Sequence, residues 1–204
     1  MTRIVYLRFL GLITFTAFLV ALLQNDALIG KRGLLPANDH LTAVKNHFKS
    51  DTSSRWSYAP TIFWFFNFED NISILLDTTA LIGMIISAII ILKGSANMIM
   101  ILSLWILYHS IVSVGQRWYS FGWESQTLET LFLSIWMVPI FSTDQFEPTP
   151  MFVSFAGNKW LIFRIMIGAG MIQVGKLIFF TIIRGFGTGT TNWLRFVVIL
   201  VGVI

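Results

Sequence analysis

The chain has 204 residues, of which 55% are hydrophobic and only 12% are charged, and its mean hydropathy is +0.75. Soluble domains carry roughly 25% charged residues, so this composition excludes an ordinary soluble domain and predicts a membrane protein. The net charge is +4, but the basic residues form no stripe, which argues against nucleic-acid binding. A sequence without cysteine also excludes disulfides, thiolate metal sites and cysteine nucleophiles.

The first long apolar segment covers residues 7–23 and follows Arg3 and Arg8. A membrane-spanning helix needs about 20 largely apolar residues, so this segment is a candidate span. A short basic stretch before an apolar core is also typical of a cleaved secretory signal peptide. Because the polar residues 24–26 follow directly, without a small-residue cleavage motif, the sequence favours an uncleaved signal anchor.

Residues 24–60 form the longest polar stretch of the chain. Within it, Asn38 or Asp39 is placed to cap a short helix. Three apolar side chains share one face of that expected helix: Leu41, Val44 and Phe48. We expect the helix to lie on the membrane surface. His40 and His47 belong to it, and without a third ligand nearby we interpret them as ordinary surface histidines.

The aromatic run TIFWFF at residues 61–66 is too short to span a membrane and predicts a segment at headgroup depth. Asn71-Ile72-Ser73 is a glycosylation sequon. Because an apolar run begins directly after it, the acceptor lies close to the bilayer, and we expect it to stay unmodified. His109, near the far end of a later apolar segment, is interpreted as a hydrogen-bonded interfacial histidine.

Four more apolar segments are candidates for membrane segments: residues 72–92, 97–114, 127–141 and 160–183. The short connector 93–96 predicts that the first two form an antiparallel hairpin. A glycine- and threonine-rich linker, 184–192, leads to a final apolar run, 193–204, that is too short for a clear span. Since strand-like alternation is lacking, the sequence predicts an all-α, multi-pass helical transmembrane bundle of about four to six membrane segments.

The segment 122–138 carries an unusual number of polar residues for a membrane helix. On a helical projection, four of them lie within about 100° of arc: Gln126, Thr127, Thr130 and Ser134. Glu124 and Glu129 lie beyond opposite edges of this stripe, so their carboxylates do not converge as an acid–base pair must. The stripe therefore predicts a polar side that faces other helices. Glu124, in the first turn, is expected to stay near the membrane interface.

We interpret five residues as a structural polar cluster: Trp123, Glu124, Gln126, Glu129 and Arg164. The Arg164 guanidinium suits a carboxylate, and we predict a pair with Glu129, with Glu124 as the second choice. Snorkelling of Arg164 to an interface without a partner is the alternative. Gly168 and Gly170 provide a small-residue patch for close helix packing. We predict no catalytic, cofactor-binding or metal site, since the glycine-rich segment 185–189 lacks the Gly-Lys-Ser/Thr of a phosphate loop.

Three segments resemble, in order, hallmarks of the lipase maturation factor family: ALIGKRGLLPA (27–37), YSFGWESQTLETLFLSIWMVP (119–139) and KWLIFRIMIGAGMIQ (159–173). The resemblance implies a non-enzymatic, multi-pass protein of the endoplasmic reticulum membrane, with 24–60 as a luminal loop. It also implies a role in folding and assembly of secreted lipases of the lipoprotein lipase type, with membrane lipid as a further partner. The family's membrane part is similar to that of vitamin K-dependent carboxylase, so a membrane-embedded enzyme of that group is the alternative function.

The resemblance covers residues 1–173, which we predict to be a family-like transmembrane domain. Residues 174–204 match nothing in the family and form a separate hydrophobic tail. Family members continue instead into a soluble luminal domain implicated in lipase contact. We therefore expect a truncated isoform or a splicing or gene-model artefact, and this expectation puts lipase maturation by the chain itself in question.

Overall fold

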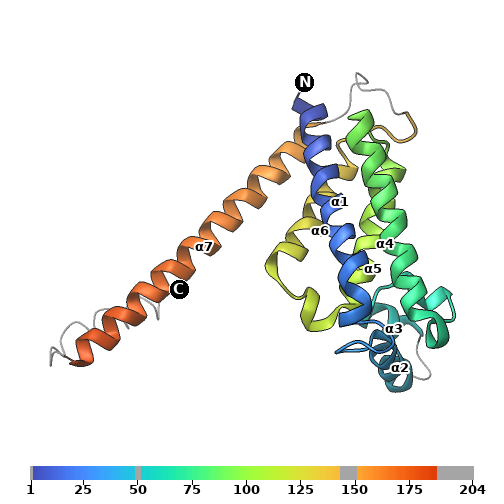
Figure 1. The fold of residues 1–204 in the computed structure, drawn as a ribbon. Coiled ribbons are helices and arrows are strands. Elements are labelled where there is room, and N and C mark those ends of the chain that lie inside the picture. The colour runs from blue at the N-terminus through green and yellow to red at the C-terminus, as the bar shows by residue number, and fades with distance from the viewer. Residues whose placement is uncertain (1, 49–51, 143–150, 188–204) are drawn as a thin grey trace. The chain divides into compact units, whose positions relative to one another are not determined.

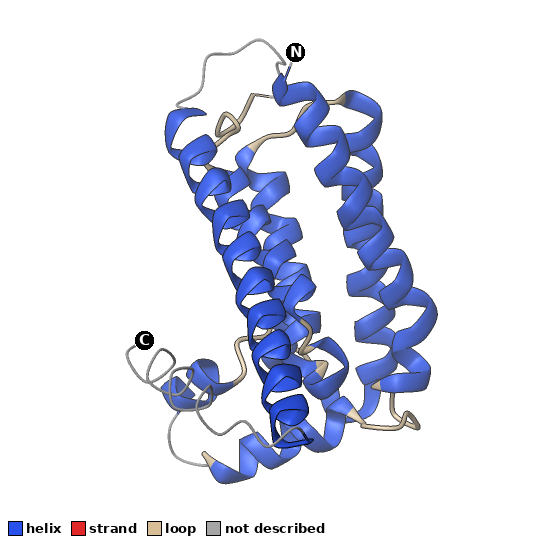
Figure 2. Cartoon of the chain, turned by 90° about the vertical axis from the view of Figure 1, so that its left-hand side faces the viewer, coloured by secondary structure: helices blue, strands red, loops and turns tan. Residues whose placement is uncertain are grey.

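The computed structural model describes residues 2–48, 52–142 and 151–187. The chain divides into two compact units, Met1–Ser154 and Phe155–Ile204, and each is described by itself. Figure 2 shows helices and loops, and no strand, in the described residues. The predicted all-α fold class is confirmed.

Three helices of the first unit carry its membrane character. Helix α1 covers Thr2–Leu28, α4 covers Phe68–Lys93 and α5 covers Met98–Val114. Within the described chain, α1 and the Asn71–Lys93 part of α4 are long and apolar enough to cross a membrane, and α5 is apolar but shorter. Together with the all-helical fold, these helices define a helical membrane protein, whereas the total number of spans stays a prediction.

The connection between α4 and α5 follows from its residue types. Helix α4 ends at Gly94, whose φ of 65° lies in the left-handed region that glycine adopts without strain. Helix α5 begins after Asn97, whose side-chain oxygen accepts a hydrogen bond of 2.8 Å from the backbone N–H of Met100. The two helices pack against each other along the bundle. The predicted hairpin is confirmed.

Helix α1 runs antiparallel to α4, and the two lie side by side (Figure 1). Small residues let them approach closely, because a Cβ added at Gly83 would lie 2.5 Å from the Phe18 ring. The hydroxyl of Ser87 donates to Thr14 Oγ1 over 3.0 Å across the same interface. Phe18 is completely buried there, so α1 is part of the core.

The polar stretch folds into two short helices and a 3-10 turn: α2 (Ala37–His47), α3 (Thr52–Tyr58) and η1 (Ile62–Phe65). The predicted helix α2 is confirmed, with Leu41 and Val44 buried on one face. The predicted cap is wrong, because Pro36 occupies the N-cap position and the helix has already begun at Asn38.

A second apolar cluster joins this stretch to one end of the bundle. It combines buried residues of the α1–α2 connection, α2, η1, α4 and α5: Ile29, Ala37, Leu41, Phe63, Phe68, Ile72, Leu76 and Val114. Ile72 and Leu76 lie in the first turns of the candidate span Asn71–Lys93. The polar stretch is therefore folded onto the end of the bundle by ordinary apolar packing.

After α5, the chain forms a 3-10 turn, η2 (Gln116–Tyr119), and then helix α6 (Gly122–Ile135), which contains the predicted polar stripe. Helix α6 begins at Gly122, where the polar segment 122–138 was expected to begin and before the apolar segment 127–141. It ends ahead of Pro139, whose carbonyl accepts from the N–H of Met98 over 2.8 Å. The second unit contributes most of α7, Met151–Gly187, which extends the predicted 160–183 at both ends. The predicted linker is helical as far as Gly187, and segment 193–204 lies outside the described residues.

Candidate functional site

The polar side of α6 is its buried side. Five residues of this helix are buried: Glu124, Thr127, Leu131, Ser134 and Ile135. Their spacing of three and four residues puts most of them on one helical face. This face packs against α5. Gln126, Glu129 and Thr130 are half-buried beside it, so the predicted stripe faces other helices along its Thr127–Ser134 edge.

Glu124 is buried in the bundle, with 2% of its surface exposed. The hydroxyl of Tyr108, on α5, donates a hydrogen bond to Glu124 Oε2. Tyr108 is itself buried, and the ring of Phe18 from α1 packs edge-on against it with 5.6 Å between centroids. The side chain of Glu124 points at α5 and takes its hydrogen bond there, and its position near the membrane interface stays a prediction.

The hydroxyl groups of α6 are satisfied mainly by their own helix. Thr127 donates to the Trp123 carbonyl over 2.9 Å and Thr130 to the Gln126 carbonyl over 2.8 Å. Ser134 donates to the Thr130 carbonyl and also contacts the hydroxyl of Tyr6, 2.8 Å away on α1. These bonds to the helix's own carbonyl groups satisfy the hydroxyls in an apolar setting. Of the three residues, Ser134 also contacts a second helix, α1.

A second polar contact joins the end of α1 to η2. The hydroxyl of Tyr119 donates to Asn25 Oδ1 over 2.5 Å. Asn25 is fully buried, and among the described residues its Nδ2 has no hydrogen-bond partner. Burial raises the pKa of Tyr119 to about 12, and the bond to Asn25 opposes this rise in part. Burial therefore favours the neutral phenol, the form that donates to Asn25 Oδ1.

The remaining predicted site residues are Trp123 and Glu129 of the first unit and Arg164, Gly168 and Gly170 of the second. Trp123 is 57% exposed on the outer side of α6. Arg164 belongs to the second unit and Glu129 to the first, so their pairing stays a prediction from the sequence. Reversing both charges, compared with each single reversal, tests it. Gly168 and Gly170 lie on α7, where an added Cβ would meet no described atom within 4 Å, and their packing role also stays a prediction.

The chemistry available at these contacts is limited. Over residues 2–48, 52–142 and 151–187, no group of three or more histidine, aspartate or glutamate side chains is placed to hold a metal ion. Glu124 has a tyrosine as its partner and no second carboxylate on the α5 side. His109 forms a contact of 3.1 Å between its Nδ1 and Ser113 Oγ, one turn away on α5. The contacts of Tyr108 with Glu124, Tyr119 with Asn25 and Tyr6 with Ser134 therefore have a structural role, since they connect different elements of the bundle.

Sequence reasoning missed the interhelical partners Tyr6, Tyr108 and Asn25. Tyr108 lies within the apolar run of α5, and Asn25 follows the apolar core of α1. Neither position shows a motif. The available signal was the residue type, because a buried tyrosine hydroxyl or asparagine amide needs a partner.

Together, the fold and its buried polar contacts define a helical membrane module. The family model described as the lipase maturation factor transmembrane domain matches residues 1–178. The chain therefore belongs to the lipase maturation factor family, and the resemblance found in the sequence is confirmed.

Curated relatives agree with this assignment. Lipase maturation factor 1 of Mus musculus is 51% identical over 178 residues, and that of Homo sapiens is 48% identical over the same length. Both alignments cover 85% of this chain and 31% of the relative. Lipase maturation factor 2 of Xenopus laevis is 27% identical over 78% of this chain and 22% of the relative. No solved structure matches the chain. These relatives give no support to the carboxylase-like alternative.

Proposed function

We propose that this chain is a membrane module of a non-enzymatic maturation factor, which acts in the endoplasmic reticulum membrane on secreted lipases. The observation that carries the proposal is the match of the lipase maturation factor transmembrane domain over residues 1–178. The name of the relatives indicates the lipase clients, and the identity of about half the aligned residues to the mammalian proteins supports a shared role. The chain spans about 31% of the length of those relatives.

In this proposal the module works as a multi-pass anchor and scaffold. The candidate spans in α1 and α4 cross the bilayer, and residues 24–60 lie on the luminal side. The contacts of Tyr108 with Glu124 and of Tyr119 with Asn25 fix the helices relative to one another. A rigid membrane scaffold of this kind holds a luminal surface at a constant distance from the bilayer, where a folding lipase is accessible.

The test uses cells that lack their own lipase maturation factor and secrete a lipoprotein lipase. Three proteins are compared: this chain, the full-length mouse relative, and a chimera in which residues 1–178 replace the matched part of that relative. We expect the chimera to restore the specific activity of the secreted lipase to within a factor of about two of the mouse protein. A chimera that is inserted stably into the membrane but restores no activity contradicts the proposal.

The chain alone provides the second comparison. If it restores lipase activity, the membrane module is sufficient for maturation. If only the chimera does, the module acts as an anchor for other parts of the relative. Immunofluorescence with an endoplasmic reticulum marker tests the proposed location in the same cells, and localisation to another membrane contradicts it.

A further inference from the structure

An open cavity of about 350 Å³ lies beside α2, where α3 packs against it. Its lining consists of four side chains from one face of α2, the residue that ends this helix, and the last residue of α3: His40, Ala43, Val44, His47, Phe48 and Tyr58. Sites for small molecules have volumes of roughly 300–1,000 Å³, so the cavity is large enough for a lipid headgroup.

The walls of this cavity are largely aromatic rings. The Tyr58 ring lies 6.4 Å from the His40 ring and 5.9 Å from the Phe48 ring, measured between centroids. The His47 ring lies 4.7 Å from that of Phe48. Among the lining residues there is no aspartate, glutamate, lysine or arginine. Burial lowers the pKa of His40, which favours its uncharged form. The cavity therefore offers ring faces without a fixed positive charge.

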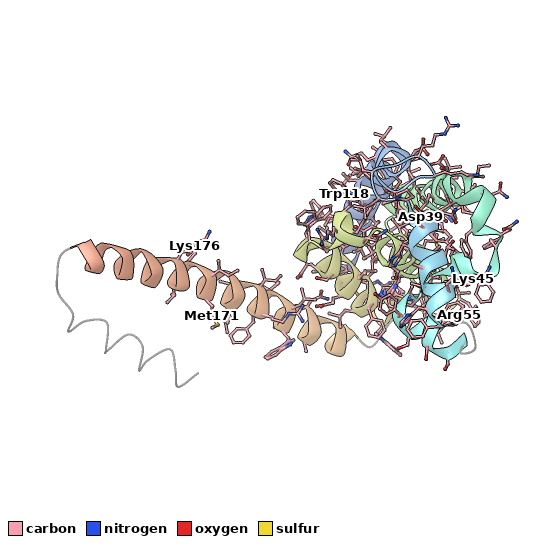
Figure 3. The ribbon with its side chains drawn as sticks, turned by 90° about the horizontal axis from the view of Figure 1, so that it is seen from below. Asp39, Lys45, Arg55, Trp118, Met171 and Lys176 are labelled. Atoms are coloured by element: carbon pink, nitrogen blue, oxygen red, sulfur yellow. The ribbon has the colours of Figure 1, made fainter. Side chains whose placement is uncertain are left out.

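A positive charge stands at the edge of the cavity. The Nε–H of Arg55, on α3, donates to the carbonyl of Phe48 over 2.8 Å. This bond brings the guanidinium next to a residue that lines the cavity. Figure 3 labels Arg55 together with Asp39 and Lys45 at this end of the unit. The Lys45 amine lies over the Phe68 ring, 5.7 Å from its centroid, and so is directed toward α4.

The cavity also lies at the level where lipid headgroups are expected. Helix α2 packs its buried Leu41 into the cluster that contains Ile72, in the first turn of the candidate span Asn71–Lys93. The neighbouring Trp56 and Phe65 form an aromatic pair with 5.3 Å between ring centroids. Tryptophan and other aromatic residues concentrate at the membrane–water boundary. Lipid headgroups are therefore the molecules present at high concentration beside the cavity.

We propose that the cavity between α2 and α3 binds the phosphocholine headgroup of a membrane lipid, with the trimethylammonium group against the rings of Tyr58 and Phe48 and the phosphate beside Arg55. Quaternary ammonium groups bind to aromatic faces through cation–π attraction. A guanidinium carries five N–H donors and a permanent charge, so Arg55 can hold the Phe48 carbonyl and also attract a phosphate. The site does not depend on the proposed role in lipase maturation.

Fluorine NMR of the full chain tests this site directly. The sequence contains four tyrosines, so incorporation of 3-fluorotyrosine gives four signals, and the signal lost in Tyr58→Phe identifies Tyr58. Dihexanoylphosphatidylcholine is titrated into the protein in maltoside micelles. We expect a saturable shift of the Tyr58 signal. The phosphatidylethanolamine and phosphatidylglycerol of the same chain length should bind about three- to tenfold more weakly, since they lack the methylated cation.

Matched variants separate the two halves of the site. Phe48→Leu keeps an apolar wall but removes a ring, and Arg55→Gln removes the charge beside the phosphate. Each is expected to weaken phosphatidylcholine binding about three- to tenfold. Phe65→Leu and Lys45→Gln, which remove an exposed ring and a cation outside the cavity, should leave it unchanged.

Three results would overturn the proposal. The first is the absence of a Tyr58 shift with phosphatidylcholine. The second is equal binding of all three lipids. The third is a shift produced by a short apolar peptide and insensitive to phosphatidylcholine, which would assign the cavity to polypeptide side chains instead.

Discussion

At the scale of single residues, the hydrogen bond between Tyr108 and Glu124 is expected to contribute to the free energy of unfolding. Without the Tyr108 hydroxyl, the buried Glu124 carboxyl loses the hydrogen-bond donor that α5 supplies. We expect Tyr108→Phe to lower the free energy of unfolding by about 1–3 kcal/mol. Equilibrium unfolding in mixed maltoside and dodecyl sulfate micelles measures this change.

Tyr6→Phe is the matched control, because it also removes a tyrosine hydroxyl that contacts α6. Ser134 keeps its bond of 2.6 Å to the Thr130 carbonyl after this change. The expected loss is therefore smaller, about 1 kcal/mol or less. Equal losses for the two variants would show that the Glu124 carboxyl is not specifically dependent on Tyr108.

Tyr119 leads to a prediction about alkaline pH. Because burial raises its pKa to about 12, above the ordinary value of 10.0, the folded chain favours the neutral phenol. Its contribution to stability is complete below pH 10 and is lost as the pH rises from 10 towards 12. We expect Tyr119→Phe to unfold with a flatter pH dependence in this window. Thermal unfolding between pH 8 and 11.5 measures it, and parallel profiles for the two proteins would contradict the assignment.

The neighbouring helix at which a polar side chain points was the feature least predictable from the sequence. The polar stripe of α6 was recognisable from its periodicity, but the projection did not show that Glu124 would point at α5. That direction depends on Tyr108, which lies in an apolar run 16 residues earlier and has no local pattern of its own. A helical projection uses the sequence of one helix, whereas a hydrogen bond between two helices depends on residues of both.

At the scale of helices, the close approach of α1 and α4 depends on Gly83. A Cβ at this position would lie 2.5 Å from the ring of Phe18, which is fully buried and has no space to move into. We expect Gly83→Ala to cost about 1–3 kcal/mol through overpacking, measured by the same unfolding experiment.

The control for this substitution is Gly175→Ala on α7, where an added Cβ meets no described atom within 4 Å. Alanine is the better helix former by about 1 kcal/mol, so this change should be neutral or stabilising. The double variant Gly83→Ala with Phe18→Leu should recover part of the loss, since it makes space for the new methyl group. Without such recovery, the cost of Gly83→Ala has another origin.

Long elements were predictable because their signals are local. The connector 93–96 predicted the tight turn between α4 and α5, and this turn is present. The short helix α3 and the turn η2 were not predicted, because four to seven residues contain too little periodicity. The start of α6 at Gly122 agrees with the polar helical segment 122–138 expected from the sequence, whereas hydrophobicity alone would place the start at residue 127.

At the scale of the whole molecule, α1 contributes to the same core as the later helices. Leu7, Leu10 and Phe18 are buried in the cluster that also contains Ile101 and Leu104 of α5. The contacts of Tyr6 with Ser134 and of Asn25 with Tyr119 connect both ends of α1 to residues that follow α5. This packing supports the signal-anchor interpretation, since removal of α1 as a signal peptide would leave a long apolar groove beside α4.

Cutting the chain between α1 and α2 tests this integration. A protease recognition sequence inserted after Leu34, which is 73% exposed, allows cleavage after purification. Because α1 is packed into the core, we expect residues 1–34 to co-elute with the remainder in mild detergent after complete cleavage. Gly83→Ala, which loosens the interface between α1 and α4, should increase dissociation, and Gly175→Ala should not. Release of the α1 fragment from the otherwise unchanged protein would show that the connector, and not the packing, retains this helix.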